Sequence, residues 1–227
     1  MGQAIRLDRG DGLHLCHLTQ IATERTLREE YIPFTIGNRF RILPPDVTVQ
    51  PADRINLIMD RGAFGSGEHE TTRSCLECLE KLPRVTGTKV LDLGSGTGIL
   101  SIAALKLGAE QAYCVDIEEA AVVACQRNCR QNGVEPNVYH CCGTLDRLSE
   151  HDFDLILANI YGDILIDVAS DLVARAKPGA HLLLSGILWE YNFDVRQRYE
   201  RLGCTLIRNQ ILEEFSTVLL KKAETRD

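Results

Sequence analysis

From Lys89 onward, short apolar runs alternate with segments whose apolar residues recur at helical spacing. Strands that alternate with helices form a mostly parallel sheet covered by helices on both faces. Two last runs follow each other too closely for a helix between them, so we expect them to pair antiparallel. The pattern predicts an α/β fold with a mostly parallel seven-stranded sheet that ends in an antiparallel strand pair. The expected strands are 89–94, 111–117, 137–143, 153–160, 180–188, 204–213 and 215–222, and the expected helices are 99–108, 118–133, 163–176 and 190–202.

The part of the chain before Lys89 carries weaker signals. Residues 1–45 are expected to form a short extension with a strand or two, and the prolines at 44 and 45 mark its end. Apolar residues at helical spacing predict a helix over 69–82. A length of 227 residues suits one α/β domain, which we expect to span 46–227.

Composition narrows the class of protein. The net charge of −7 argues against a nucleic-acid substrate, because proteins that grip a phosphate backbone usually carry a basic face. No apolar run is long enough to span a membrane, and the N-terminus lacks the apolar core of a secretory signal, so we expect a cytoplasmic protein. Nine cysteines, an odd number, do not suggest a disulfide framework. Cys75 and Cys78 lack a second CxxC pair, so we expect reduced thiols and no metal.

The run VLDLGSGTG, residues 90–98, lies between a predicted strand and a predicted helix. Its glycines, Gly94, Gly96 and Gly98, let the backbone turn sharply and approach a ligand closely. Such a turn lies at the carboxyl edge of a parallel sheet, where ligands bind. A nicotinamide dinucleotide fingerprint requires its third glycine at position 99, which is Ile99 here. We therefore predict a cofactor loop and disfavour a nicotinamide oxidoreductase.

Polar residues close two of the predicted strands. Asp116 ends the second strand, 22 residues after Gly94, where a carboxylate accepts hydrogen bonds from both hydroxyls of a ribose. Its alternative role is to cap the helix that follows. Ile117 would then lie near an adenine. Asn159 ends the fourth strand, where it would contact the ligand or an incoming nucleophile, unless it only forms a strand-end turn.

A glycine-rich stretch, DRGAFGSGEHETT, leads into the helix predicted at 69–82. A capped helix start explains Thr71 or Thr72 but not the preceding FGSG. Phe64 looks exposed in this stretch, and Glu68 and His69 are candidate polar edges of a pocket. We interpret the stretch as part of the same ligand site.

The runs AFGSGEHETT and VLDLGSGTGILSIAALKLGA, the aspartate of VDI, then ANI and LLLSGIL, together resemble the bacterial PrmA family over about residues 31–222. Those enzymes methylate a protein of the large ribosomal subunit. The resemblance implies a class I, Rossmann-like methyltransferase fold and S-adenosylmethionine as cofactor. It also implies cofactor contacts at Thr72, Gly94, Asp116 and Asn159. Too few residues precede the matching region for the family's N-terminal substrate-recognition domain, which we expect to be missing.

The resemblance implies methylation of amino groups on a protein, ribosomal or other. We expect Asn159 to orient the amine, with Phe64 and Tyr161 as walls of the pocket, so Asn159 and Tyr161 are the candidate catalytic residues. Alternatives are a methyltransferase for a small molecule, which needs no recognition domain, and a non-catalytic cofactor-binding module. The full set of predicted cofactor contacts is Thr72, Gly94, Gly96, Gly98, Asp116, Ile117, Asn159 and Phe64.

Overall fold

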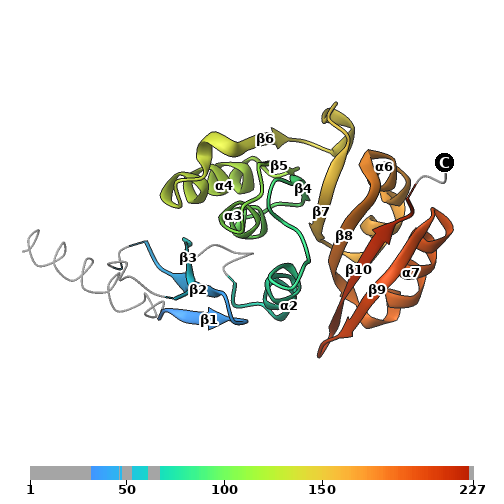
Figure 1. Ribbon diagram of the computed structural model, residues 1–227, viewed down its shortest axis with the longest axis horizontal. Helices are drawn as coiled ribbons and strands as arrows, with labels where there is room; N and C mark the ends of the chain where they lie inside the picture. Colours follow the sequence, from blue (N-terminus) through green and yellow to red (C-terminus); the bar gives the residue numbers. More distant parts are fainter. Residues whose placement is uncertain (1–31, 46, 48–52, 61–66, 225–227) are drawn as a thin grey trace, which may run out of the picture. The chain divides into compact units, whose positions relative to one another are not determined.

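The computed structural model describes residues 32–45, 47, 53–60 and 67–224. Its main sheet has seven strands in the order β6-β5-β4-β7-β8-β10-β9 (Figure 1). Neighbours from β6 to β8 pair in parallel, whereas β10 runs antiparallel to both β8 and β9. The predicted fold class is therefore confirmed. The strands are β4 (Lys89–Leu93), β5 (Gln111–Asp116), β6 (Val138–Cys142), β7 (Phe153–Asn159), β8 (Ala176–Leu188), β9 (Cys204–Ile211) and β10 (Phe215–Lys222).

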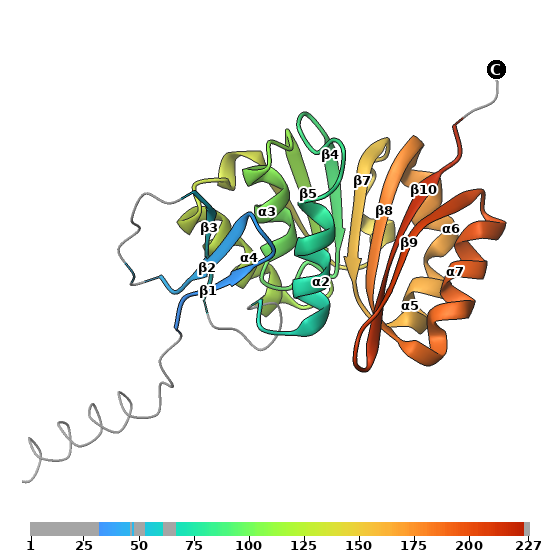
Figure 2. The same cartoon turned by 60° about the horizontal axis from the view of Figure 1, so that its bottom comes forward.

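The chain order places helices on both faces of this sheet. The connections from β4 to β5 and from β5 to β6 step one way along the sheet, and the connection from β7 to β8 steps the other way. Since such crossovers are right-handed, their helices lie on opposite faces. Contacts bear this out: α2, α3 and α4 form one group, and α5, α6 and α7 another (Figure 2). The helices are α2 (Glu70–Leu79), α3 (Ile99–Lys106), α4 (Glu119–Gln131), α5 (Gly162–Asp167), α6 (Ala169–Arg175) and α7 (Asn192–Arg201).

The central strands are apolar because both of their faces are covered. Four consecutive residues of β7, Leu155 to Ala158, are buried, as are Leu182 to Leu184 of β8. Burial on both faces explains why these strands show continuous apolar runs instead of alternation. It also holds their carboxyl ends, where Asn159 lies, in a rigid frame.

A second sheet of three strands precedes the large one in the chain. Its strands are β1 (Phe34–Ile36), β2 (Phe40–Leu43) and β3 (Ile55–Ile58). β2 pairs antiparallel with β1 and parallel with β3, so this pairing joins residues on both sides of the predicted boundary at 45/46. The boundary itself stays a prediction.

Two local expectations were wrong. The single helix expected at 163–176 is two helices, because Val168 has φ −85° and ψ 0°, away from the helical ψ of about −42°. The turn expected at 177–179 lies inside β8. There the chain bulges: Phe153 pairs with Ala176, but Leu155, two residues on, pairs with His181. The bulge accommodates Gly179, whose φ is +78°.

Among the described residues, no helix has the length and apolarity needed to cross a bilayer.

Candidate functional site

The glycine-rich turn joins β4 to α3 at the carboxyl edge of the large sheet. All three of its glycines have left-handed φ values, +68° at Gly94, +53° at Gly96 and +79° at Gly98. The N–H groups of Gly94 and Ser95 both donate to the carbonyl oxygen of Val115 on β5, at 2.8 and 3.1 Å. These bonds fix the turn against the neighbouring strand, so the predicted strand–turn–helix unit is confirmed.

Two side chains explain why glycine is needed at the ends of this turn. A Cβ at position 94 would lie 2.3 Å from Cγ2 of Ile160, and one at position 98 would lie 2.4 Å from Sγ of Cys125. The requirement for glycine therefore comes from packing within the chain as well as from backbone conformation.

Asp116 is held directly beside the turn. Its Oδ2 accepts a hydrogen bond from the N–H of Gly96 at 2.8 Å, and its Oδ1 accepts one from the N–H of Glu118 at 3.0 Å. The second bond holds Glu118, the residue that precedes α4. Asp116 is not the cap of that helix, because Glu118 is the N-cap residue and no side chain caps the helix start. A carboxylate oxygen has two lone pairs, which leaves each oxygen able to accept one more hydrogen bond. The fixed carboxylate is thus suited to a pair of hydroxyl groups.

Two features next to Asp116 fit a bound nucleoside. The side chain of Ile117 is 71% exposed, so an apolar surface lies open beside the carboxylate. In the glycine turn, Oγ of Ser95 is buried without a hydrogen-bond partner among the described residues. A buried hydroxyl without a partner costs free energy unless a ligand or water satisfies it. The residues present therefore fit a ligand with polar groups at this turn.

Thr72 and Asn159 lie together although 87 residues separate them. Asn159 ends β7, and its Nδ2 is 3.5 Å from Oγ1 of Thr72 on α2. The start of α2 is fixed by His69, whose Nδ1 accepts a hydrogen bond from the N–H of Thr71 at 3.3 Å. That bond makes His69 a cap of the helix. The structure thus brings two predicted site residues together.

The remaining candidates are less constrained. Tyr161 follows β7 at the start of α5 and is 60% exposed. Phe64 lies outside the described residues. The roles of both as pocket walls stay predictions.

Asp92, inside the same motif, is fully buried, which raises its pKa from 3.8 to about 7. Its Oδ2 accepts hydrogen bonds from the hydroxyl of Ser101 at 2.7 Å and from the N–H of Ser101 at 3.2 Å. Ser101 lies in the first turn of α3, so Asp92 anchors the helix that follows the glycine turn. Its role is to support the turn from beneath.

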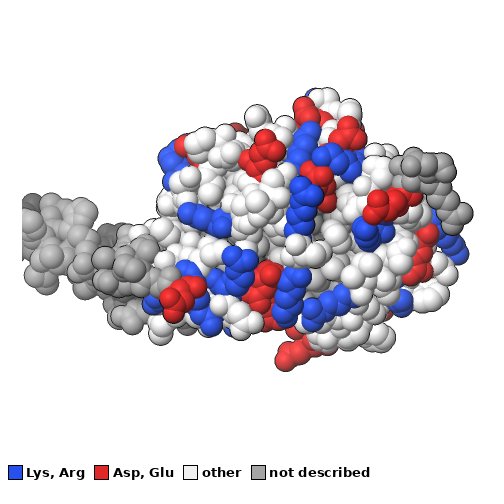
Figure 3. All heavy atoms as spheres, in the orientation of Figure 1, with Lys and Arg blue, Asp and Glu red and all other residues white. Residues whose placement is uncertain are grey.

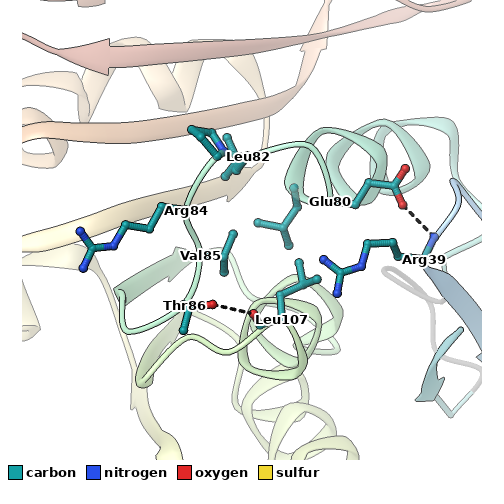
Figure 4. A pocket seen from close by; sticks show the side chains of 9 residues that line it. Arg39, Glu80, Leu82, Arg84, Val85, Thr86 and Leu107 are labelled. Carbon is teal, nitrogen blue, oxygen red and sulfur yellow. Dashed lines mark hydrogen bonds between the residues drawn. The ribbon is translucent and has the colours of Figure 1, made fainter.

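One hollow lies away from this site. It has a volume of about 350 Å³ and is lined by residues that include Arg39, Arg84 and Leu107 (Figure 4). Residues 84–86 lead into β4, whereas the glycine turn follows β4, so this hollow is at the opposite edge of the sheet. A second hollow, of about 290 Å³, is lined by His69, Glu70 and residues 213–215, next to the start of α2. Only the second hollow adjoins the candidate site.

Comparison with known proteins decides the family. The model of the ribosomal protein L11 methyltransferase (PrmA) family matches residues 12–223. The chain belongs to this family. The L11 methyltransferase of Geobacter sulfurreducens is 42% identical over 79% of this chain and 59% of its own length. The chain thus spans about three fifths of that relative.

Solved structures agree on the fold. The L11 methylase of Lactobacillus delbrueckii subsp. bulgaricus matches with a TM-score of 0.77 and 25% identity, over 86% of this chain and all of that one. An RNA methyltransferase from Salinibacter ruber, solved with S-adenosyl-L-homocysteine, matches with a TM-score of 0.55 and 17% identity, over 68% of this chain and 94% of that one. At that identity the second likeness concerns the fold alone. Together, the two matches show that this chain has the class I, Rossmann-like methyltransferase fold.

Sequence reasoning missed two features near the site. One is the carboxylate of Glu70, which accepts hydrogen bonds from three backbone N–H groups in the turn between β9 and β10. The sequence alone places Glu70 only in the first turn of a predicted helix. The other is a group of thiols around His140, whose members are scattered in the sequence. Cys125 and Cys129 are four residues apart on a helix, a spacing that differs from the CxxC pattern typical of zinc sites.

Proposed function

We propose that this chain transfers the methyl group of S-adenosylmethionine to an amino group of a protein. The observation that carries the proposal is the carboxylate of Asp116, fixed by the N–H of Gly96 beside a left-handed glycine turn. Family membership supports the reaction class. When bound, the cofactor supplies an activated methyl group on a sulfonium sulfur.

Each predicted contact has a distinct task. Asp116 accepts hydrogen bonds from the ribose hydroxyls, and Ile117 offers an apolar surface to the adenine. The turn from Gly94 to Gly98 brings backbone close to the cofactor. Thr72 and Asn159 would contact the methionine part of the cofactor, and Phe64 would complete the cofactor contacts. These tasks rest on position in the fold and on the family's pattern.

The acceptor is an amine that must lose its proton before it attacks the methyl group. A lysine amine has a pKa of about 10.4, so the protonated form dominates at neutral pH and cannot attack. Asn159, at the rigid end of β7, orients the amine, and Tyr161 forms an open wall. The nearby hollow carries Glu213 and Glu214, whose charges favour the approach of a cationic side chain. Alignment and exclusion of water are the main contributions that such a site makes to the rate.

A ribosomal protein is the proposed acceptor, because the relatives are named for methylation of L11. On the face drawn in Figure 3, Lys and Arg side chains are interspersed with Asp and Glu, which gives little support to a phosphate-backbone footprint there. The test is incubation of the full chain with cell extract and S-adenosylmethionine labelled in its methyl group. Label in protein at amino nitrogen supports the proposal. Label only in RNA or in small metabolites contradicts it.

Replacement of Asp116 tests the cofactor site by itself. We expect Asp116→Ala to weaken binding of S-adenosylhomocysteine by at least about tenfold, since hydrogen bonds to a charged group contribute about 1.5–3 kcal/mol. Isothermal titration calorimetry measures the affinity. Asp171→Ala, at an exposed position of α6, is the matched control and should bind normally. Equal affinity in both variants would remove the ribose assignment.

A further inference from the structure

Three metal-ligating side chains, those of Cys114, Cys125 and His140, meet under helix α4, next to the groups that support the glycine turn, and Cys129 lies beside Cys125. Cys114 on β5 and His140 on β6 are directly paired in the parallel register, so both side chains point to the same face of the sheet. Cys125 and Cys129 are four residues apart on α4, which contacts both strands (Figure 1). Residues at this spacing share one face of a helix. Strand and helix therefore present thiols and an imidazole to one another.

The distances suit a single ion. Cys114, Cys125 and His140 each offer one ligand atom, and these three atoms lie within 4.8 Å of one another. Sγ of Cys129 is 3.9 Å from Sγ of Cys125. Two thiolates on a tetrahedral zinc, each about 2.3 Å from the metal, are about 3.8 Å apart. The two helix thiols, 3.9 Å apart in an S–H···S hydrogen bond, have a spacing close to this value.

His140 provides a second, independent indication of a ligand. Both of its ring nitrogens, Nδ1 and Nε2, are buried and have no hydrogen-bond partner among the described residues. A neutral imidazole has one donor and one acceptor, and leaving both unsatisfied in the interior is costly. Coordination of a metal by one nitrogen would satisfy the acceptor. The thiols of Cys114, Cys125 and Cys129 are also buried. The group of possible metal ligands contains no carboxylate.

We propose that Cys114, Cys125 and His140 bind a zinc ion, with Cys129 as the fourth ligand. Sulfur and imidazole ligands in a closed tetrahedral set are typical of structural zinc. Each thiol that binds zinc releases its proton to solvent, so the zinc–thiolate bonds form without an oxidant or reductant. The site touches the glycine turn, because Sγ of Cys125 occupies the space that a side chain at Gly98 would need. Zinc would thus stabilise the turn from beneath without joining the reaction.

Titration with a spectroscopic substitute tests the site in the unaltered chain. The full chain, reduced and stripped of metal, is titrated with Co²⁺, which absorbs strongly when thiolates coordinate it. We expect saturation at one equivalent and displacement of Co²⁺ by Zn²⁺. Absence of a thiolate-to-cobalt absorption band from the folded chain would overturn the proposal, and this readout does not depend on methyltransferase activity or on cofactor binding.

Variants then identify the ligands. Cys125→Ser and His140→Gln should each weaken Zn²⁺ binding by more than about tenfold, since even outer partners of a metal site contribute that much. Cys204→Ser is the control for a buried thiol and Cys142→Ser for an exposed one on β6. Both controls should retain one zinc per chain by elemental analysis. Unchanged zinc affinity in the first two variants contradicts the assignment, and the Co²⁺ titration decides if they fail to fold.

Discussion

The glycine at position 94 is constrained twice, by its φ of +68° and by the side chain of Ile160. Gly87 separates these effects, because its φ is +72° but nothing lies within 4 Å of the Cβ it would gain. Both Gly→Ala changes carry a similar backbone strain of about 1 kcal/mol. We expect Gly94→Ala to lose about 1–3 kcal/mol more than Gly87→Ala, because overpacking adds to the strain. Urea unfolding measures the difference.

A second substitution identifies the cause of that difference. Ile160→Ala removes the atom that the new Cβ would meet, so Gly94→Ala should cost less stability in the Ile160→Ala background than in the parent chain. If Gly94→Ala costs the same in both backgrounds, the contact with Ile160 is not the reason for glycine there.

Burial of Asp92 makes stability depend on pH. Its pKa is raised from 3.8 to about 7, mainly by burial, so between these values the folded state holds a proton that the unfolded state has lost. Stability therefore falls as the pH rises from about 4 to 7, and the loss is complete above the folded pKa. Asp92→Asn cannot ionise. We expect this variant to lose less stability than the parent between pH 5 and pH 8 in urea unfolding, and equal losses would contradict the shift.

At the scale of single residues, some roles were predictable and others were not. The positions of Gly94, Asp116 and Asn159 followed from the sequence, because strand ends in a parallel sheet meet at one edge. The contact between Ile160 and Gly94 did not follow, since Ile160 comes directly after β7, a strand that pairs with β4 in space but begins 60 residues after β4 ends. Tertiary packing decides such contacts, and no local pattern encodes them.

Helix α2 connects two distant turns through carboxylates at its ends. Glu70, in its first turn, accepts hydrogen bonds from the N–H groups of Glu213, Glu214 and Phe215 at 3.0–3.3 Å. Glu80, at its C-terminal cap, accepts bonds from the turn between β1 and β2, at residues 38–39. One helix thus fixes a turn of the small sheet and a turn of the large sheet. It also positions Thr72 between them.

Loss of Glu70 should loosen one of these turns selectively. We expect Glu70→Ala to speed hydrogen exchange of the amides at 213–215 by about tenfold or more, because the turn loses its acceptors. Glu77→Ala, on the same helix, is the control. In Glu70→Ala, hydrogen exchange in the turn between β1 and β2, measured by mass spectrometry, should change little. Uniform acceleration across both turns would indicate unfolding of the whole helix instead.

At the scale of elements, the strands of the large sheet and the helices that cover it were predictable, because strands and helices give different patterns of apolar residues in the sequence. The apolar runs of β7 and β8 and the helical spacing of α4 are local signals. In the small sheet, β1 and β2 match the strand or two expected before residue 45, whereas β3 was missed because it has only four residues and pairs with β2 across a long connection. The break at Val168 was also invisible, because neither glycine nor proline marks it.

Two asparagines, Asn128 of α4 and Asn132 at its C-terminal cap, bind the small sheet and the chain that follows it. Asn132 exchanges two hydrogen bonds with the backbone of Ile58 at the end of β3. Asn128, one turn earlier, accepts from the N–H of Asp60 at 3.2 Å and donates to the carbonyl oxygen of Thr97 at 2.9 Å. Its fully buried amide therefore links the chain that follows the small sheet to the turn at the candidate cofactor site.

The difference between these asparagines tests whether the link matters for ligand binding. Asn128→Ala and Asn132→Ala should each destabilise the chain by about 1–3 kcal/mol, because each leaves buried backbone groups without partners. Only Asn128 contacts the glycine turn, so we expect Asn128→Ala alone to weaken S-adenosylhomocysteine binding, by about tenfold. Calorimetry under conditions where both variants are folded separates affinity from stability. If both variants lost affinity equally, the cofactor site would depend on the small sheet as a whole, and the Asn128 amide would have no separate role in shaping the turn.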